Sequence, residues 1–430
     1  MKTALLLALY LTLNSFFALS QEEEYYDENY LRYTNHIYKE NIYTVLAHRD
    51  GWVLSNPVMY LNSENGIVVS FDNLDTDIKD YSYTVEHCNA NWQPSGLMRS
   101  EFIEGFTENQ ITDYAYSFNT MVEYVHYNVH IPNEDMKITL PGNYILKIYE
   151  DFDEKDLVIT KRFFVVEDKV GIEASIKRPS QIDRRNYSHE IDFTLNTTGL
   201  NLIDPFNEIK VVIRQNNRWD NEITDLKPMY IKDNQLIYDY DVGNLFYAGS
   251  EFRFFDIKSL RYQSERIQQI EYEKPYYHVR LLDDESRRFQ VYLYHQDLNG
   301  RYMPEVQEGE DDDTEADYCY VYFTLPYEAP MIDGNFYVFG SLSDWNYNAR
   351  NRMTYNYEKK AYQLKMLLKQ GYYNYEYIYV QDGTTLADNT FLEGSHYETE
   401  NDYVIYVYHR GINDRYDKLV GLKTINSLRQ

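Results

Sequence analysis

The stretch VEYVHYNVHI, residues 122–131, decides the class of fold that the sequence predicts. From residue 125 to residue 131 its odd-numbered side chains are Val, Tyr, Val and Ile, whereas the even-numbered ones between them are His, Asn and His. Successive side chains of an extended strand point to opposite faces, so this alternation places the apolar side chains on one face. The stretch therefore predicts a half-buried antiparallel strand.

The same alternation recurs along the chain, whereas amphipathic helical stretches are scarce. It is found in SHEIDFTLN (188–196), IKVVIRQ (209–215) and DYCYVYFTL (317–325). Short strands at regular spacing, with turns between them, are typical of β-sandwiches. We therefore expect a mainly β protein with three consecutive antiparallel β-sandwich domains of the immunoglobulin-like kind.

The chain has 430 residues, enough for two to four domains of roughly 100–200 residues each. In chain order we expect a signal peptide (1–20), an acidic Tyr-rich tail (21–39), a first sandwich (40–168), a second sandwich (169–304), an acidic loop (305–316) and a third sandwich (317–430). The boundary between the second and third sandwiches is left open, because residues 287–304 have the pattern to pair with either.

The first twenty residues have the features of a secretory leader. Lys2 precedes an apolar run over residues 4–13, and small side chains lead up to Ser20. This pattern predicts cleavage between Ser20 and Gln21. The run is shorter than the roughly 20 apolar residues of a membrane-spanning helix, and the first cysteine is Cys88, far from the cleavage point. We expect an exported protein that does not itself insert into a membrane.

The balance of charge excludes some classes of partner. There are 41 basic and 69 acidic side chains, which gives a net charge of −28. Binding to nucleic acid requires clustered Lys and Arg, so nucleic acid is not an expected partner. The 47 tyrosines have an apolar body and a polar tip, and they suit surfaces that contact another protein.

No pattern of a metal or catalytic site stands out. His126 and His130 are four residues apart, which on a strand separates them by about 13 Å, too far to share one ion. The run EVQEGEDDDTEAD (305–317) is expected to be a solvated loop; calcium binding there is left open, although the spacing of an EF-hand is missing. Cys88 and Cys319 are either two buried thiols or one long-range disulfide. We expect no metal, no cofactor and no catalytic residue.

Several stretches of the first sandwich (40–168) together resemble one known family. They are YSYTVEHCNANWQPSGLMRSEFIEGF (81–106), ITDYAYSFNTMVEYVHY (111–127), PGNYILKIY (141–149) and RFFVVED (162–168). In this order they resemble the first domain of the type IX secretion system plug proteins of Bacteroidota. Two downstream stretches, YAGSEFRFFDIKSLRYQSERI (247–267) and YHQDLNGRY (294–302), also resemble that family.

The resemblance implies a periplasmic, non-enzymatic protein, associated with the outer membrane only through its partner. That partner would be the large translocon barrel, whose periplasmic mouth the protein would close while the pore is idle. No small-molecule substrate is expected. The sequence does not indicate which face contacts the barrel or what triggers release.

The third sandwich (317–430) resembles the early-set immunoglobulin-like fold of glycogen-binding modules. The resemblance lies in FGSLSDW (339–345), AYQLKMLLKQG (361–371) and YYNYEYIYVQDG (372–383). Such modules bind a sugar through a Trp on the turn, a Lys on the next aromatic strand and a second Trp. Trp345 matches the first position, but Glu376 and Thr385 stand at the other two. We therefore prefer a structural role for Trp345.

Two alternative functions are kept. The first is an exported carbohydrate-binding accessory protein, with Trp345 as its candidate sugar contact. The second is a glycoside-acting enzyme, which would need a cleft with two carboxyl groups about 5–10 Å apart. With 69 acidic residues in the chain, some close pairs are unavoidable, but none stands out.

Overall fold

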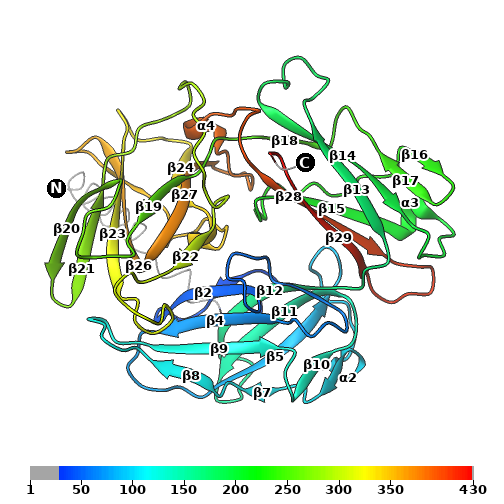
Figure 1. Cartoon of the computed structure of the whole chain (residues 1–430), viewed down its shortest axis with the longest axis horizontal. Coiled ribbons are helices and arrows are strands. Elements are labelled where there is room, and N and C mark those ends of the chain that lie inside the picture. Colours follow the sequence, from blue (N-terminus) through cyan, green and yellow to red (C-terminus); the bar gives the residue numbers. More distant parts are fainter. Residues whose placement is uncertain (1–28, 429–430) are drawn as a thin grey trace, which may run out of the picture.

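The structure, a computed structural model, describes residues 29–428. It contains three β-sandwiches that meet around a common junction (Figure 1). This confirms the expected mainly β, antiparallel sandwich fold. The predicted cleavage site between Ser20 and Gln21 lies outside the described residues. Within residues 29–428, no helix has the length and apolar character needed to cross a membrane.

The first domain lies at the bottom of Figure 1 and is built from short strands and one helical turn. Its elements are β1 (His36–Ile37), β2 (Ile42–Arg49), β3 (Val58–Tyr60), β4 (Ile67–Asn73), β5 (Tyr81–Cys88), α2 (Arg99–Phe102), β6 (Ile103–Gly105), β7 (Asn109–Gln110), β8 (Asp113–Tyr116), β9 (Val125–Ile131), β10 (Met136–Ile138), β11 (Gly142–Glu150) and β12 (Leu157–Val166). One sheet has the order β1-β12-β11-β5-β7, with β3 parallel to β12, and the other has the order β2-β4-β9-β8. A two-stranded sheet, β10-β6, accompanies them.

Strand β9 carries the alternation that predicted the fold. Val125, Tyr127, Val129 and Ile131 are buried in the core of the first domain, as expected. His126 is also buried, although it belongs to the opposite, polar face. The strand is therefore covered on part of both faces, because the third domain packs against the face that carries His126.

The second domain, at the right of Figure 1, combines strands from two distant parts of the chain. Its elements are β13 (Gly171–Lys177), β14 (Ser188–Asn196), α3 (Pro205–Glu208), β15 (Ile209–Gln215), β16 (Tyr230–Lys232), β17 (Gln235–Tyr238), β18 (Leu245–Tyr247), β28 (Asp402–His409) and β29 (Lys418–Asn426). One sheet has the order β13-β14-β17-β16, with β18 beside β14, and the facing sheet has the order β15-β28-β29.

The position of β28 and β29 corrects an expectation from the sequence. We expected residues 317–430 to form the third sandwich. Instead, β28 pairs antiparallel with β15 of the second domain, with Ile209 opposite His409 at one end and Gln215 opposite Tyr403 at the other. Side chains of β13, β14, β15 and β28 share one apolar core. Figure 1 shows the red C-terminal strands beside the green strands of this domain. The third domain is therefore inserted into the second.

The third domain, at the left of Figure 1, begins earlier than expected. Its elements are β19 (Arg253–Asp256), β20 (Ile267–Glu273), β21 (Tyr276–Leu281), β22 (Tyr302–Pro304), β23 (Tyr318–Pro326), β24 (Gly334–Phe339), η2 (Ser341–Ser343), β25 (Thr354–Asn356), β26 (Ala361–Lys369), β27 (Gly371–Gln381) and α4 (Thr390–Glu393). One sheet has the order β19-β27-β22, with β24 beside β27, and the other has the order β20-β21-β23-β26-β25, in which β21 and β23 are parallel. Residues 253–304 thus belong here and not to a second sandwich ending at residue 304.

Candidate functional site

The contact between the first and second domains is apolar. Side chains of both domains form one buried cluster, whose members include Val58, Trp92, Ile145, Phe164 and Val166 of the first domain and Val212, Val404, Tyr406, Tyr408 and Leu419 of the second. The ring centroids of Phe164 and Tyr406 are 4.7 Å apart. Tyr408 adds a hydrogen bond from its hydroxyl to Asn143 Oδ1, at 2.8 Å. The two domains therefore share a continuous core, which resists separation as the core of a single domain does.

The contact between the first and third domains is organised around one buried carboxylate. Asp72 on β4 lies 2.7 Å from Lys369 Nζ, accepts a hydrogen bond from the Tyr318 hydroxyl at 2.6 Å and lies 2.6 Å from His126 Nδ1. Burial by itself would raise the pKa of Asp72, but Lys369 and His126 outweigh it, and the pKa lies below its usual value. A buried charge that is paired and hydrogen-bonded in this way ties the two domains together in one geometry.

The end of the acidic loop packs on the first domain. Asp317 accepts hydrogen bonds from the main-chain amides of Met121 and Val122, at 2.7 and 3.1 Å. The Tyr124 hydroxyl donates to the carbonyl oxygens of Asp313 and Ala316. In the part of the chain that the structure describes, no group of three or more His, Cys, Asp or Glu side chains is placed to hold a metal ion. The loop thus takes part in the contact between the first and third domains.

All three domains meet at a stack of aromatic and cationic side chains. The guanidinium of Arg162 lies 4.2 Å from the ring centre of Trp92 and 4.4 Å from that of Trp219, while Arg214 lies 3.6 Å from the centre of Trp219. Burial lowers the pKa of Arg162 to about 9, so the side chain keeps its charge at neutral pH. Next to it Lys161 pairs with Asp344 of the third domain, at 2.7 Å. Cation–π contacts of this kind are strongest where water is excluded.

Trp345, the candidate sugar contact, lies at this junction. Its side chain is 5% exposed and packs edge-on against Phe252 and Phe339. A Cβ atom at Gly300, whose φ is +78°, would come within 2.4 Å of the Trp345 ring, so a glycine is needed there. Stacking a sugar on this ring would require the neighbouring aromatic rings to move away. This position favours the structural role.

Glu376 and Thr385, at the other two positions of the sugar-binding pattern, do not form a sugar site either. Glu376 is buried, with its carboxylate 3.0 Å from Asn389 Nδ2 and 3.7 Å from Arg218 of the second domain. Thr385 is exposed, and its carbonyl oxygen accepts a hydrogen bond from Tyr347 at 2.7 Å. Neither residue places a ring or a free cation beside Trp345. The sequence's remaining candidates, Cys88 and Cys319, are two buried free thiols rather than a disulfide.

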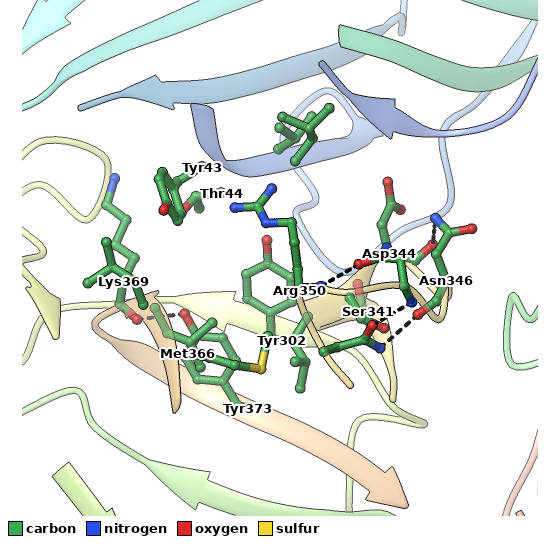
Figure 2. Close-up of a pocket in the computed structure, with 18 of the residues that line it drawn as sticks. Tyr43, Thr44, Tyr302, Ser341, Asp344, Asn346, Arg350, Met366, Lys369 and Tyr373 are labelled. Atoms are coloured by element: carbon green, nitrogen blue, oxygen red, sulfur yellow. Dashed lines mark hydrogen bonds between the residues drawn. The ribbon is translucent and has the colours of Figure 1, made fainter. Parts of the chain in front are cut away.

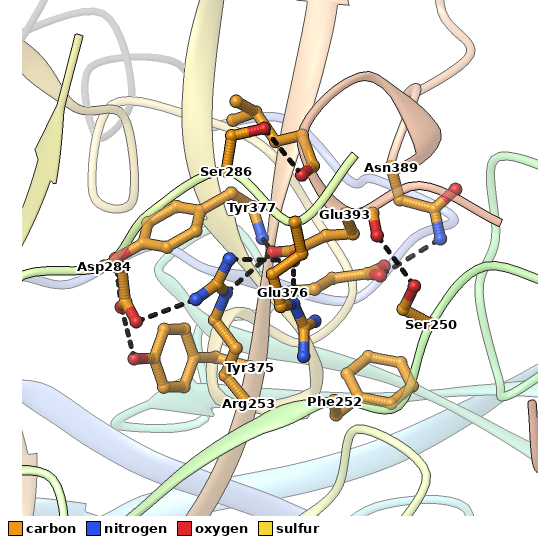
Figure 3. A network of polar contacts seen from close by, with 12 residues as sticks. Ser250, Phe252, Arg253, Asp284, Ser286, Tyr375, Glu376, Tyr377, Asn389 and Glu393 are labelled. Carbon is orange, nitrogen blue, oxygen red and sulfur yellow. Dashed lines mark hydrogen bonds and ion pairs between the residues drawn. The ribbon is translucent and has the colours of Figure 1, made fainter. Parts of the chain in front are cut away.

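The most prominent cluster of acids lies inside the third domain (Figure 3). Arg253 bridges Asp284 and Glu393, at 2.8 and 2.9 Å, and Arg287 also pairs with Glu393, at 2.7 Å. Burial would raise the pKa of Glu393, but Arg253 and Arg287 hold it at about 2. A general acid needs a raised pKa and access to substrate. The pKa of Glu393 is lowered rather than raised, and both Asp284 and Glu393 are buried and paired with arginines, so the network has a structural role.

One exposed segment contrasts with these buried contacts. Between β21 and β22 the chain leaves the sheets, and Phe289, Val291 and Leu293 are 91, 92 and 80% exposed. The hydroxyl of Tyr292, between them in sequence, donates to Glu251 and to the carbonyl of Glu398. Among the described residues, the amides of Phe289, Val291 and Leu293 have no hydrogen-bond partner. The segment is thus a stretch of chain outside the sheets, with unpaired amides and an apolar outer face.

The sequence carries a signal for this segment in its alternation of apolar and polar side chains. RRFQVYLYHQ (287–296) alternates like the other strands, and we expected it to pair within a sheet. Its apolar side chains face outward instead, because Tyr292 on the other face is held by Glu251 and by the carbonyl of Glu398.

The architecture is that of a multi-domain β-sandwich protein, and comparison with known proteins gives its family. Residues 42–167 match the family described as type 9 secretion system plug protein 1st domain. The chain therefore belongs to the type 9 secretion system plug protein family. Among solved structures, the crystal structure of a hypothetical protein from Parabacteroides merdae ATCC 43184 is 35% identical, covers 92% of this chain and 100% of its own, and superposes with a TM-score of 0.90. No curated protein matches the chain.

Proposed function

We propose that this protein is a non-catalytic, periplasmic plug subunit that docks on the periplasmic mouth of the type 9 translocon barrel and closes the idle pore. The family of its first domain supports the assignment to this secretion system. The shared apolar core and the buried Asp72–Lys369 pair support a blocking role, because three domains locked together resist being pushed apart.

The observation that carries docking is the apolar outer face of the 289–293 segment. Three large apolar side chains at alternate positions, all turned to solvent, mark a surface that a partner covers. The free amides of Phe289, Val291 and Leu293 also allow an extended segment of the translocon to add as a strand, with main-chain hydrogen bonds and alternate side-chain pockets. We propose that the barrel contributes such a segment.

Docking is tested by affinity purification of the full chain from the native envelope. Replacing Phe289, Val291 and Leu293 together by Ser is expected to reduce recovery of the barrel protein at least about tenfold, because burial of three apolar side chains is lost. The matched control is Ile332→Ser, which changes a single side chain that is 95% exposed elsewhere in the third domain. Recovery equal to that of the unchanged protein would contradict the proposed surface.

Pore closing is tested in cells. A deletion strain is expected to keep secreting, but to take up a large antibiotic that the outer membrane normally excludes, because the unoccupied translocon stands open to the periplasm. The triple Ser variant should behave like the deletion. Unchanged permeability in the deletion strain, with the translocon present and empty, would refute the plug assignment.

A further inference from the structure

A cavity of about 400 Å³ lies between the first and third domains (Figure 2). The first domain contributes residues 35–45 to its wall, and the third contributes residues around η2, the following loop and β26. Its size falls within the range of sites for small molecules, roughly 300–1,000 Å³. The proposed plug function gives this cavity no role.

Two cations of the wall have no acidic partner. The Arg350 guanidinium lies 4.9 Å from the ring centre of Tyr43, and Lys365 Nζ lies 3.6 Å from that of Tyr320. Neither pairs with a carboxylate within residues 29–428, although the chain has 69 acidic against 41 basic side chains. In contrast, Lys369 of the same wall is neutralised by Asp72.

The carboxylates that line the cavity do not supply the missing partners. Asp344 is held by Lys161 at 2.7 Å and by Asn35 at 3.0 Å. Glu40 stands exposed at the rim and pairs with neither cation. The wall therefore retains positive charge that a bound anion would neutralise.

A hydroxyl without a protein partner within residues 29–428 points into the same space. Tyr302 on β22 is only 8% exposed, yet its hydroxyl has no hydrogen-bond partner among the described residues. Figure 2 shows this hydroxyl directed into the cavity, toward the side where the Arg350 guanidinium lies. The hydroxyl oxygen is accessible from the cavity, so it is free to donate a hydrogen bond to a bound ligand.

We propose that this cavity binds a small organic anion through a carboxylate or phosphate group. Arg350 binds the anion with its two-pronged guanidinium, Lys365 adds a second charge, and Tyr302 donates its hydroxyl to an anion oxygen. The rings of Tyr43 and Tyr320 hold the two cations and border the body of the ligand. Because both domains line the cavity, the bound anion strengthens the contact between them.

The test uses the purified full chain without the translocon, so its outcome is independent of the plug assignment. Citrate, glucuronate, glucose 6-phosphate and inorganic phosphate are titrated by calorimetry, with glucose as the neutral control. We expect at least one anion to bind with a stoichiometry near one and to raise the thermal midpoint, because a ligand stabilises the state that binds it. Glucose should do neither. The pattern across the four anions separates a carboxylate site from a phosphate site.

Variants locate the binding. Arg350→Gln should weaken it at least about tenfold, since a charge-assisted contact is lost, and Tyr302→Phe should weaken it severalfold without lowering the stability of the free protein. Arg261→Gln removes the same charge from an exposed position of the third domain outside the cavity and should leave binding unchanged. The proposal is overturned if none of the four anions binds, or if binding is the same in Arg350→Gln and in Arg261→Gln.

Discussion

The first domain contacts its two neighbours in opposite ways. Against the second domain it buries a continuous apolar cluster, in which Phe164 meets Tyr406. Against the third it buries the Asp72–Lys369 pair and leaves a cavity of about 400 Å³. Apolar burial is non-directional and fills space, whereas buried charges need specific partners and resist close packing around them. The two contacts should therefore respond differently to loss of volume and to loss of charge.

The largest effect is expected on the apolar side. Phe164 packs between Trp92 and Tyr406 with almost no exposure, so Phe164→Ala should lower the free energy of unfolding by about 5 kcal/mol through lost burial and the cavity left behind. Phe164→Leu, which keeps most of the volume, is the control and should cost about 1.5 kcal/mol. Guanidinium denaturation measures both. A cost below about 1 kcal/mol for Phe164→Ala would show that this contact does not act as a core.

A somewhat smaller loss of stability is expected when the buried charge pair between the first and third domains is broken, and a second substitution should restore part of it. Lys369→Met leaves Asp72 buried without its cation and should cost about 4 kcal/mol. The Tyr318 hydroxyl and His126 still hold the carboxylate, which keeps the loss from being larger. The double variant Asp72→Asn/Lys369→Met removes both charges and should recover at least half of the loss in the same denaturation assay. Equal stability of the single and double variants would mean that charge is not what holds this contact.

The smallest effect depends on pH and extends the comparison to the contact between the second and third domains. Burial raises the pKa of Glu376 from 4.5 to about 7. Between pH 4.5 and about pH 7, Glu376 is therefore protonated in the folded protein but ionised in the unfolded chain. This contribution to stability is therefore present below pH 4.5 and is lost as the pH rises to about 7. At about 1.36 kcal/mol per pH unit it amounts to about 3 kcal/mol.

Glu376→Gln, which does not titrate, provides the reference for this effect. The stability of the unchanged protein minus that of the variant should fall by about 3 kcal/mol between pH 4.5 and pH 7.5. Taking the difference cancels the titration of every other group, including His87 and His189, whose pKa values burial lowers to about 4. A difference that stays constant with pH would show that Glu376 is ionised in the folded protein at neutral pH.

The candidate sites show that sequence patterns around a single residue do not predict which side chains of different domains will meet. The Trp that follows FGSLSD resembles a sugar contact of glycogen-binding modules, but in the structure the ring of Trp345 is enclosed by Phe252 and Phe339. Nothing in the neighbourhood of Asp72 or Lys369 indicated that they would meet, since 297 residues separate them. The cavity at Arg350 and Tyr302 likewise exists only where two domains come together.

Alternation of apolar and polar side chains is a property of neighbouring residues, and by itself it determined the strands, the sandwich class of fold and the apolar face of β9. The run of motifs between residues 81 and 168 likewise indicated the family. Tertiary structure alone decided that β28 pairs with β15 and that the third domain is inserted into the second. The physical reason is that strands with the same period two are interchangeable as partners. Only the packing of a whole domain, with β28 completing the core of β14 and β15, selects one pairing over the others.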